Sequence, residues 1–214
     1  NDYYNDDHYY RVKKMLLPEN VKARFKILHE VAEKYSHHKS FYGWYWAWEA
    51  CLSPYFSDHF IKYFNDTTRE ARVLTPNAKF LTAPYGTKNA RNDKKFIKQL
   101  ESLDVDFIAY QDTVGCYAMN TEQSKRAFEI LRKVHDQVPQ RILWADVETF
   151  TWEGKANDVK TPLIPAEFSR LEAQLKAVSP YVEKILVFIF QGLFSKPDSP
   201  TFTGYDKAGK YYTE

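Results

Sequence analysis

The sequence predicts an α/β fold in which parallel strands alternate with helices, arranged as in a (β/α)8 barrel. The first observation is the alternation itself, because five strand-like runs are separated by segments whose apolar residues have helical spacing. The second is the run Ile185–Phe190, which is apolar throughout and typical of a parallel strand buried on both faces. The third is the scarcity of glycine: the chain has 7 Gly and no Gly-x-Gly-x-x-Gly after its first strand, which disfavours a dinucleotide-binding fold.

The elements follow one another as successive strand–helix units. A helix begins at Pro18, since Val21, Phe25 and Leu28 then fall at helical spacing, and Ser57 is suited to cap the next helix. The expected strands are 41–49, 79–85, 105–112, 141–148 and 185–191, and the later helices are 58–72, 93–103, 121–137 and 165–178. A closed barrel of this type has eight strands. We therefore expect a partial barrel of about five units, or one that another segment completes.

The chain has no internal linker, so we expect a single domain over residues 1–214. Residues 1–17 begin with a polar and aromatic stretch without periodicity and are expected to form a loop or arm, and residues 196–214 a polar tail. The sequence contains neither a signal peptide nor an initiator Met at position 1. We expect the chain to be processed, or excised from something longer.

Composition excludes several classes of function. The 30 basic and 28 acidic residues leave a net charge of +2, which argues against a nucleic-acid surface, and the lysines of 88–98 are interpreted as a solvated helix face. No apolar run is long enough to span a membrane. Cys51 and Cys116 lack the His and Cys neighbours of a zinc site, so we expect neither a metal nor another cofactor, and no disulfide framework. The aromatic content of 17% suits either sugar stacking or a bulky core.

Side-chain alternation along 141–148 separates two faces. Leu143, Ala145 and Val147 form the apolar set that would face the helices. The other set, Ile142, Trp144, Asp146 and Glu148, would point into the barrel, and it becomes more polar toward the C-terminal end of the strand.

The strand 41–49 alternates in the same way. Trp44, Trp46 and Trp48 share one face, interpreted as core against the helices rather than as a sugar platform. Tyr45 and Glu49 share the other face with small residues, which leave room for a ligand.

Glu49 and Glu148 are the candidate catalytic residues. A single glutamate at a strand end is more often a structural residue bonded to a neighbouring loop, but two inward glutamates on strands three apart would lie across the barrel mouth from each other. Glycoside hydrolysis uses two such carboxyl groups, about 5 Å apart for retention of configuration and roughly 6.5 to 9.5 Å for inversion. The acid needs a raised pKa, for which the tryptophan-rich surroundings of Glu49 are suited.

Polar and aromatic residues at other strand ends are candidate substrate-binding groups. Asp112 would either bond a sugar hydroxyl or hold a loop, and Trp144 would either stack on a sugar or fill the barrel. The full candidate set is Tyr45, Tyr85, Gln111, Asp112, Trp144, Asp146, Trp152 and Gln191.

Three segments carry a resemblance to a known family. The runs 40–49 (SFYGWYWAWE), 105–115 (VDFIAYQDTVG) and 143–150 (LWADVETF) resemble the DUF4434 family, whose members are glycoside-hydrolase-like TIM-barrel proteins common in Bacteroidetes. The resemblance implies that the visible strands are barrel strands four to eight. It further implies that Glu49 is the acid/base on strand four and Glu148 the nucleophile on strand seven, as in the large retaining glycosidase clan. That clan usually has Asn before its strand-four glutamate, where this chain has Trp48.

The sequence therefore predicts a retaining glycoside hydrolase that acts on an oligo- or polysaccharide. The family resemblance implies a periplasmic, surface or secreted location. Two alternatives stay open: a non-catalytic carbohydrate-binding barrel, and a barrel fragment that is inactive alone. Because five strands leave two sheet edges unpaired, we expect a missing segment, a second copy of the chain or the N-terminal arm to cover them.

Overall fold

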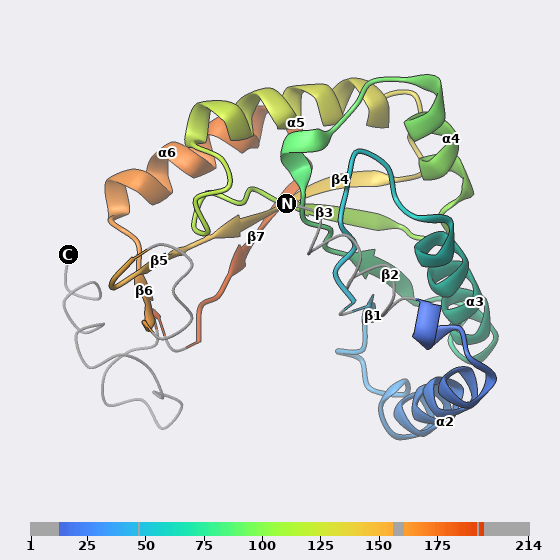
Figure 1. The fold of residues 1–214 in the computed structure, drawn as a ribbon. Coiled ribbons are helices and arrows are strands. Elements are labelled where there is room, and N and C mark those ends of the chain that lie inside the picture. The colour runs from blue at the N-terminus through green and yellow to red at the C-terminus, as the bar shows by residue number, and fades with distance from the viewer. Residues whose placement is uncertain (1–12, 47, 156–160, 192, 195–214) are drawn as a thin grey trace.

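A computed structural model describes residues 13–46, 48–155, 161–191 and 193–194 of the chain. Its main sheet has five strands whose order in space follows their order in the chain, and every neighbouring pair is parallel. The strands are β1 (Gly43–Trp46), β2 (Lys79–Thr82), β3 (Phe107–Gln111), β4 (Ile142–Glu148) and β7 (Lys184–Phe188). The sheet curls into part of a (β/α) barrel (Figure 1), which confirms the predicted fold class and the five parallel strands.

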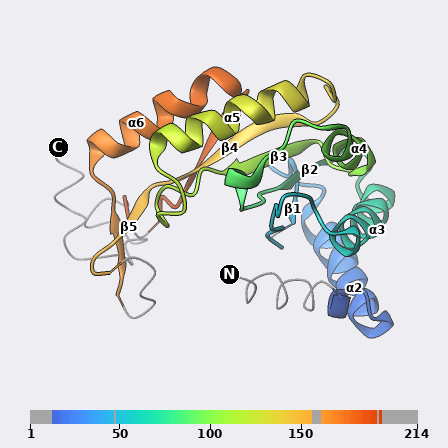
Figure 2. The ribbon, with the colours of Figure 1, turned by 45° about the horizontal axis from the view of Figure 1, so that its top comes forward.

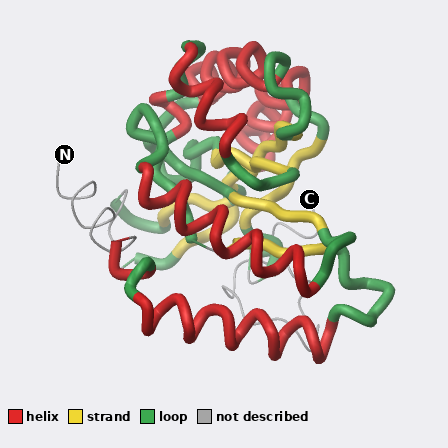
Figure 3. Tube along the Cα trace, turned by 90° about the vertical axis from the view of Figure 1, so that its right-hand side faces the viewer, coloured by secondary structure: helices red, strands yellow, loops and turns green. Residues whose placement is uncertain are grey.

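The helices follow the convex side of this sheet as an arc, visible in Figures 1 and 2. Those between and after the strands are α3 (Asp58–Leu74), α4 (Lys94–Ser102), α5 (Thr121–His135) and α6 (Phe168–Val178). An earlier helix, α2 (Pro18–Tyr35), lies beside α3 (Figure 3). The described residues also form two short 3-10 helices, η1 (Thr87–Asn89) and η2 (Ser179–Tyr181).

Local sequence explains where these helices begin. The Ser57 hydroxyl accepts from the backbone N–H of Phe60, and Asp93 accepts from the second and third residues of α4. Asn120 and Gln123 form a reciprocal capping box at the start of α5. Each such cap contributes about 1 kcal/mol to stability.

Apolar side chains pack on both faces of the sheet. Trp44, Trp46, Leu143, Ala145 and Val147 belong to the large cluster that also contains the buried helix residues. A smaller cluster lies on the opposite, inner face and consists of Ala83, Phe107, Ala109 and Trp144, with Leu81, Ile142 and Leu186 against it. Both alternation patterns inferred for β1 and β4 are therefore confirmed.

The structure differs from expectation at three places. β7 is not fully buried, because it pairs only with β4 and lies at the sheet edge; Val187 and Phe188 are 49% and 46% exposed. The segment after Glu148, where no strand was predicted, contains a hairpin formed by antiparallel β5 (Phe150–Trp152) and β6 (Leu163–Pro165). Residues 13–15, expected within the arm, are helical.

Residues 1–12 of the arm and the tail at 196–214 lie outside the described residues. In the part of the chain that is described, no helix is long and apolar enough to cross a bilayer.

Candidate active site

Five predicted residues come together on the inner face, where the carboxyl ends of parallel strands meet at one edge of the sheet. Gln111 ends β3, directly opposite Asp146 in the β3–β4 register, and Glu148 ends β4. Tyr45 lies on β1 and Glu49 follows three residues after the strand ends. Strand ends of this kind are where α/β barrels carry their functional groups.

Glu148 is the most tightly held of these residues. It is 6% exposed, and its Oε2 accepts a hydrogen bond of 2.7 Å from the backbone N–H of Cys116. The pKa of its carboxyl is raised to about 7, mainly by burial; the negative charges of Asp112 and Asp146 add to the rise, and the Cys116 hydrogen bonds oppose it. The group can therefore change its protonation state near neutral pH.

A compact loop after β3 wraps around the Glu148 carboxyl group. At Gly115 the backbone passes so close that an added Cβ would lie 2.7 Å from Glu148 Cβ and 2.8 Å from the Phe150 carbonyl oxygen. Thr113 and Tyr117 both have positive φ angles, of 50° and 59°. Such angles cost non-glycine residues of the order of 1 kcal/mol and are concentrated at functional sites. The loop conformation thus presents the Cys116 N–H to the carboxylate.

Glu49 is an exposed residue whose carboxyl group is partly shielded from water, and it lies beyond the regular part of its strand. Burial raises the pKa of its carboxyl, and a hydrogen bond with the Gln111 side chain opposes the shift. Gln111 is held in turn by a bond of 3.2 Å from its side-chain N–H to the Ala83 carbonyl. Trp44 and Trp46 of β1 pack toward the helices.

Asp146 interacts electrostatically with both glutamates, and Tyr45 interacts with Glu49 and Asp146. Burial raises the pKa of Asp146 to about 6, with further contributions from Asp112 and Glu49. The pKa of Tyr45 is raised by burial, then by Glu49 and Asp146, although half of the residue is exposed. Asp146 also acts on Glu148. These groups therefore form one electrostatically coupled set.

Trp144 does not present a stacking face. It is only 8% exposed and stacks on Phe107 with ring centres 4.2 Å apart, while the Lys184 ammonium lies 4.7 Å from its ring centre. Of the two alternatives for this residue, the structure favours the one in which it fills the barrel interior.

The remaining predicted residues are Tyr85, Trp152 and Gln191. The backbone of Tyr85 pairs with the segment after Glu49, through bonds of 2.9 Å with Ala50 and Leu52, and its side chain contacts Cys51. Trp152 is half-buried on β5, and Gln191 is exposed in a turn beyond β7. Cys51 and Cys116 are free cysteines.

Asp112 lies behind the site rather than in it. It is fully buried, its Oδ1 accepts from the Glu148 backbone N–H at 3.0 Å, and its Oδ2 accepts from the Gln174 side chain at 2.6 Å. The structure therefore favours the alternative in which Asp112 holds the chain, and corrects its place among the substrate-binding candidates. The reason is alternation: Gln111 faces inward, so the next residue faces the helices.

Several residues around Glu148 were not predicted. Gln174 and Arg170 of α6 reach its backbone carbonyl at 3.0 Å and 3.3 Å. Phe188 pairs with Glu148 in the β4–β7 register and is 46% exposed, so it offers an aromatic surface beside the carboxyl group. The position of Asp112 in the strand alternation, one residue after the inward-facing Gln111, was the one sequence signal that could have indicated a contact with the helix layer.

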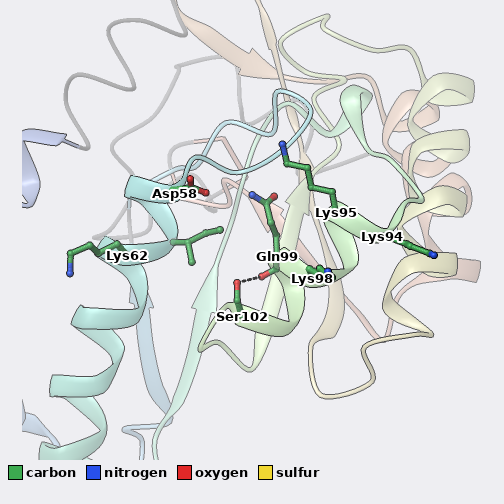
Figure 4. Close-up of a pocket in the computed structure, with 8 residues that line it drawn as sticks. Asp58, Lys62, Lys94, Lys95, Lys98, Gln99 and Ser102 are labelled. Atoms are coloured by element: carbon green, nitrogen blue, oxygen red, sulfur yellow. Dashed lines mark hydrogen bonds between the residues drawn. The ribbon is translucent and has the colours of Figure 1, made fainter.

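A groove of about 670 Å³ lies elsewhere, on the outer side between α3 and α4. Figure 4 shows its labelled lysines extending in different directions, with Lys62 and Lys94 toward opposite sides. Lys62 bonds Asp66 and Lys95 lies over the Tyr55 ring, so the groove is a solvated helix surface. No group of three or more His, Cys, Asp or Glu in the described ranges is arranged to hold a metal ion.

The chain belongs to the DUF4434 family, described as a domain of unknown function, because the family profile matches residues 2–201. Among solved structures it is similar to a provisionally assigned alpha-L-fucosidase from Bacteroides thetaiotaomicron, with 20% identity and a TM-score of 0.65 over 87% of this chain and 59% of that one. It is also similar to a beta-D-glucuronidase from Dictyoglomus thermophilum, with 14% identity and a TM-score of 0.57 over 85% of this chain and 30% of that one.

These similarities show a glycosidase-like fold, and the chain spans less than two thirds of the length of either protein. No protein with a curated description matches the chain significantly.

Proposed function

We propose that this member of the DUF4434 family carries the catalytic carboxyl groups of a retaining glycoside hydrolase. The observation that carries the proposal is the inward pair Glu49 and Glu148, both with raised pKa values, at the ends of parallel strands in a glycosidase-like fold. Retaining hydrolysis needs one carboxyl group that holds a proton and one carboxylate that can attack. The comparison proteins support the fold, and the residues support the chemistry.

In the first step Glu49 donates its proton to the glycosidic oxygen while a Glu148 carboxylate oxygen attacks the anomeric carbon. The bond from that carbon to the leaving oxygen breaks, the leaving group departs as an alcohol, and a glycosyl ester of Glu148 forms. The Cys116 N–H, bonded to Oε2, fixes the orientation of the nucleophile.

In the second step Glu49 takes a proton from water. The water oxygen attacks the anomeric carbon and releases the sugar and the Glu148 carboxylate. Tyr45, Gln111 and Asp146 are suited to bond sugar hydroxyl groups, because Gln111 and Asp146 are neighbours in the β3–β4 register and Tyr45 interacts electrostatically with Glu49 and Asp146. Phe188 supplies an apolar surface for one sugar face.

The test is hydrolysis of aryl glycosides by the full-length protein, with an α-L-fucoside and a β-D-glucuronide chosen first because of the comparison proteins. We expect a product with retained anomeric configuration, observable by NMR. Azide should rescue Glu148→Ala with inversion and Glu49→Ala with retention, because azide replaces the nucleophile in the first variant and attacks the glycosyl ester in the second.

Two results would contradict this assignment. Inverted product from the wild-type protein would exclude the double-displacement mechanism. Glycan binding without hydrolysis across the panel would favour the non-catalytic carbohydrate-binding alternative.

A further inference from the structure

We propose that Asp112 and Gln174 form a positioning pair that fixes the backbone of Glu148 and tunes the ionisation of its carboxyl group. The proposal rests on the hydrolase function above, in which Glu148 is the attacking carboxylate. Neither residue touches the inner face. They act on Glu148 from the helix side of the sheet.

The contacts hold both backbone polar groups of Glu148, its N–H and its carbonyl oxygen. Asp112 Oδ1 accepts from the Glu148 N–H at 3.0 Å, and the Gln174 side-chain N–H donates to the Glu148 carbonyl at 3.0 Å. The two side chains are joined to each other at 2.6 Å. Because α6 supplies Gln174 and the end of β3 supplies Asp112, the last residue of β4 is tied to two other elements at once.

Burying the polar side chains of Asp112 and Gln174 costs free energy, which argues for a role beyond packing. Asp112 and Gln174 are both 0% exposed, and the Gln174 carbonyl oxygen has no hydrogen-bond partner among the described residues. Replacing such a buried polar pair with apolar residues of similar volume is often neutral or stabilising. A buried carboxylate retained directly behind a catalytic glutamate therefore points to control of that glutamate.

The hydrogen bonds to Asp112 are those of an ionised carboxylate. It accepts from the N–H groups of Glu148, Val114 and Gln174 and donates in none of these contacts. Burial raises its pKa, while these three bonds and the charge of Arg170 oppose the shift. A negative charge at this position disfavours ionisation of Glu148.

Four titratable groups face Glu148 from the elements around it. Asp112 and Asp146 raise the pKa of its carboxyl, and hydrogen bonds from Cys116 lower it. Arg170 of α6 is the nearby cation; burial lowers the pKa of its guanidinium, and the charges of Asp112, Tyr117 and Glu148 oppose this shift. Asp112 contributes more than Asp146, so its removal should have the larger effect.

The experiment uses the full-length protein with ¹³C-labelled glutamate, and the Glu148 carboxyl signal is identified by its loss in Glu148→Gln. Asp112→Asn keeps an acceptor for the Glu148 N–H and removes the charge. It should lower the measured pKa of Glu148 by about one unit, while Asp146→Asn, which leaves the pair intact, should lower it by less.

Gln174→Met removes the donor and keeps the length of the side chain. It should lower kcat about 10- to 100-fold with KM nearly unchanged, and should accelerate hydrogen exchange at the Glu148 amide. Gln99→Met is the matched control, because Gln99 is also buried and holds both backbone groups of Phe56, far from the site. It should lower the melting temperature without changing kcat or the Glu148 titration.

The proposal is overturned if Asp112→Asn leaves the Glu148 titration unchanged, or if Gln174→Met and Gln99→Met reduce kcat equally. If the wild-type protein hydrolyses no glycoside, the hydrolase function fails. The carboxyl titration and the amide exchange of Glu148 still decide whether the pair positions and tunes this residue.

Discussion

The two glutamates of the candidate site stand in different structural settings. Glu148 ends a regular strand of seven residues, and side chains or backbone groups from β3, the following loop and α6 hold its N–H, its carbonyl and its carboxylate. Glu49 lies beyond a strand of four residues and is held by a contact with Gln111. Glu148, the proposed nucleophile, is thus held at three of its polar groups, and Glu49, the proposed acid, has a side-chain contact with Gln111.

This difference matches the demands of the two roles. A nucleophile must approach one carbon atom along one direction, where a displacement of 1 Å can cost about 100-fold in rate. A general acid must reach an oxygen, exchange its proton and later accept one from water, which a more loosely held carboxyl group can do. The following predictions test whether Glu148 is held more rigidly than Glu49.

The largest effects are expected from removing the carboxyl groups themselves. Glu148→Gln should reduce kcat/KM for an aryl glycoside by about 10⁴-fold or more, because no ester intermediate can form. Glu49→Gln should reduce it by about 10²- to 10⁴-fold, and less for a substrate with a good leaving group that needs no proton. Glu153→Gln, at an exposed position of the hairpin, is the control and should retain activity. Equal losses for both aryl leaving groups in Glu49→Gln would contradict the acid assignment.

The next largest effect is expected from a substitution that places an extra methyl group against Glu148. In Gly115→Ala the new methyl group would meet Glu148 Cβ at 2.7 Å and the Phe150 carbonyl at 2.8 Å, so the carboxyl group must move. We expect kcat to fall about 10- to 100-fold and the free energy of unfolding to fall by about 1 to 3 kcal/mol.

Gly154→Ala provides the comparison for this variant. Its new methyl group meets the Thr161 side-chain methyl at 2.6 Å, a group that can rotate away. Steady-state kinetics on both variants should show the loss at Gly115 alone, and similar kcat values would mean that the close approach at Gly115 has no catalytic role.

The buried Glu148 carboxyl should also make stability depend on pH. Its pKa is about 7 in the folded chain against a reference value of 4.5, so the folded state binds more protons than the unfolded state between these values. Stability contributed by this group is therefore present at low pH and lost as the pH rises through about 7.

Glu148→Gln removes the ionisation, so the variant should become more stable than the wild type above neutral pH, by a few kcal/mol. The advantage should shrink as the pH falls toward the reference value. Thermal melts of both proteins at about pH 5 and pH 8 measure the difference. A constant difference across this range would mean that Glu148 ionises alike in the folded and unfolded states.

The smallest effects concern the two faces of β1. Trp46→Phe removes a buried hydrogen bond of 2.9 Å to Thr68 and should lower the free energy of unfolding by about 1 to 3 kcal/mol without changing substrate affinity. Tyr45→Phe, on the half-exposed inner face, should leave stability unchanged and weaken glycan binding. Denaturant unfolding and calorimetric titration separate the two, and the reverse result would mean that the faces have been assigned wrongly.

Much of the fold could be predicted because it depends on local pattern. The alternation of Trp44, Tyr45 and Trp46 assigns their faces once a strand is assumed, and Ser57 and Asp93 cap their helices by contacts within a few residues. The hairpin of β5 and β6 was missed because its strands have three residues each and are stabilised by pairing with residues that are not their neighbours in the sequence.

The sequence by itself determined the parallel five-stranded order, the inward placement of Glu148 and the helix-facing placement of Trp44 and Trp46, because periodicity and capping are properties of neighbouring residues. Only the tertiary structure decided how each glutamate is held. Asp112 and Gln174 are separated by 62 residues along the chain, and their contact exists because α6 packs against the end of β4. No local pattern encodes such a contact, because its energy depends on the burial that packing creates.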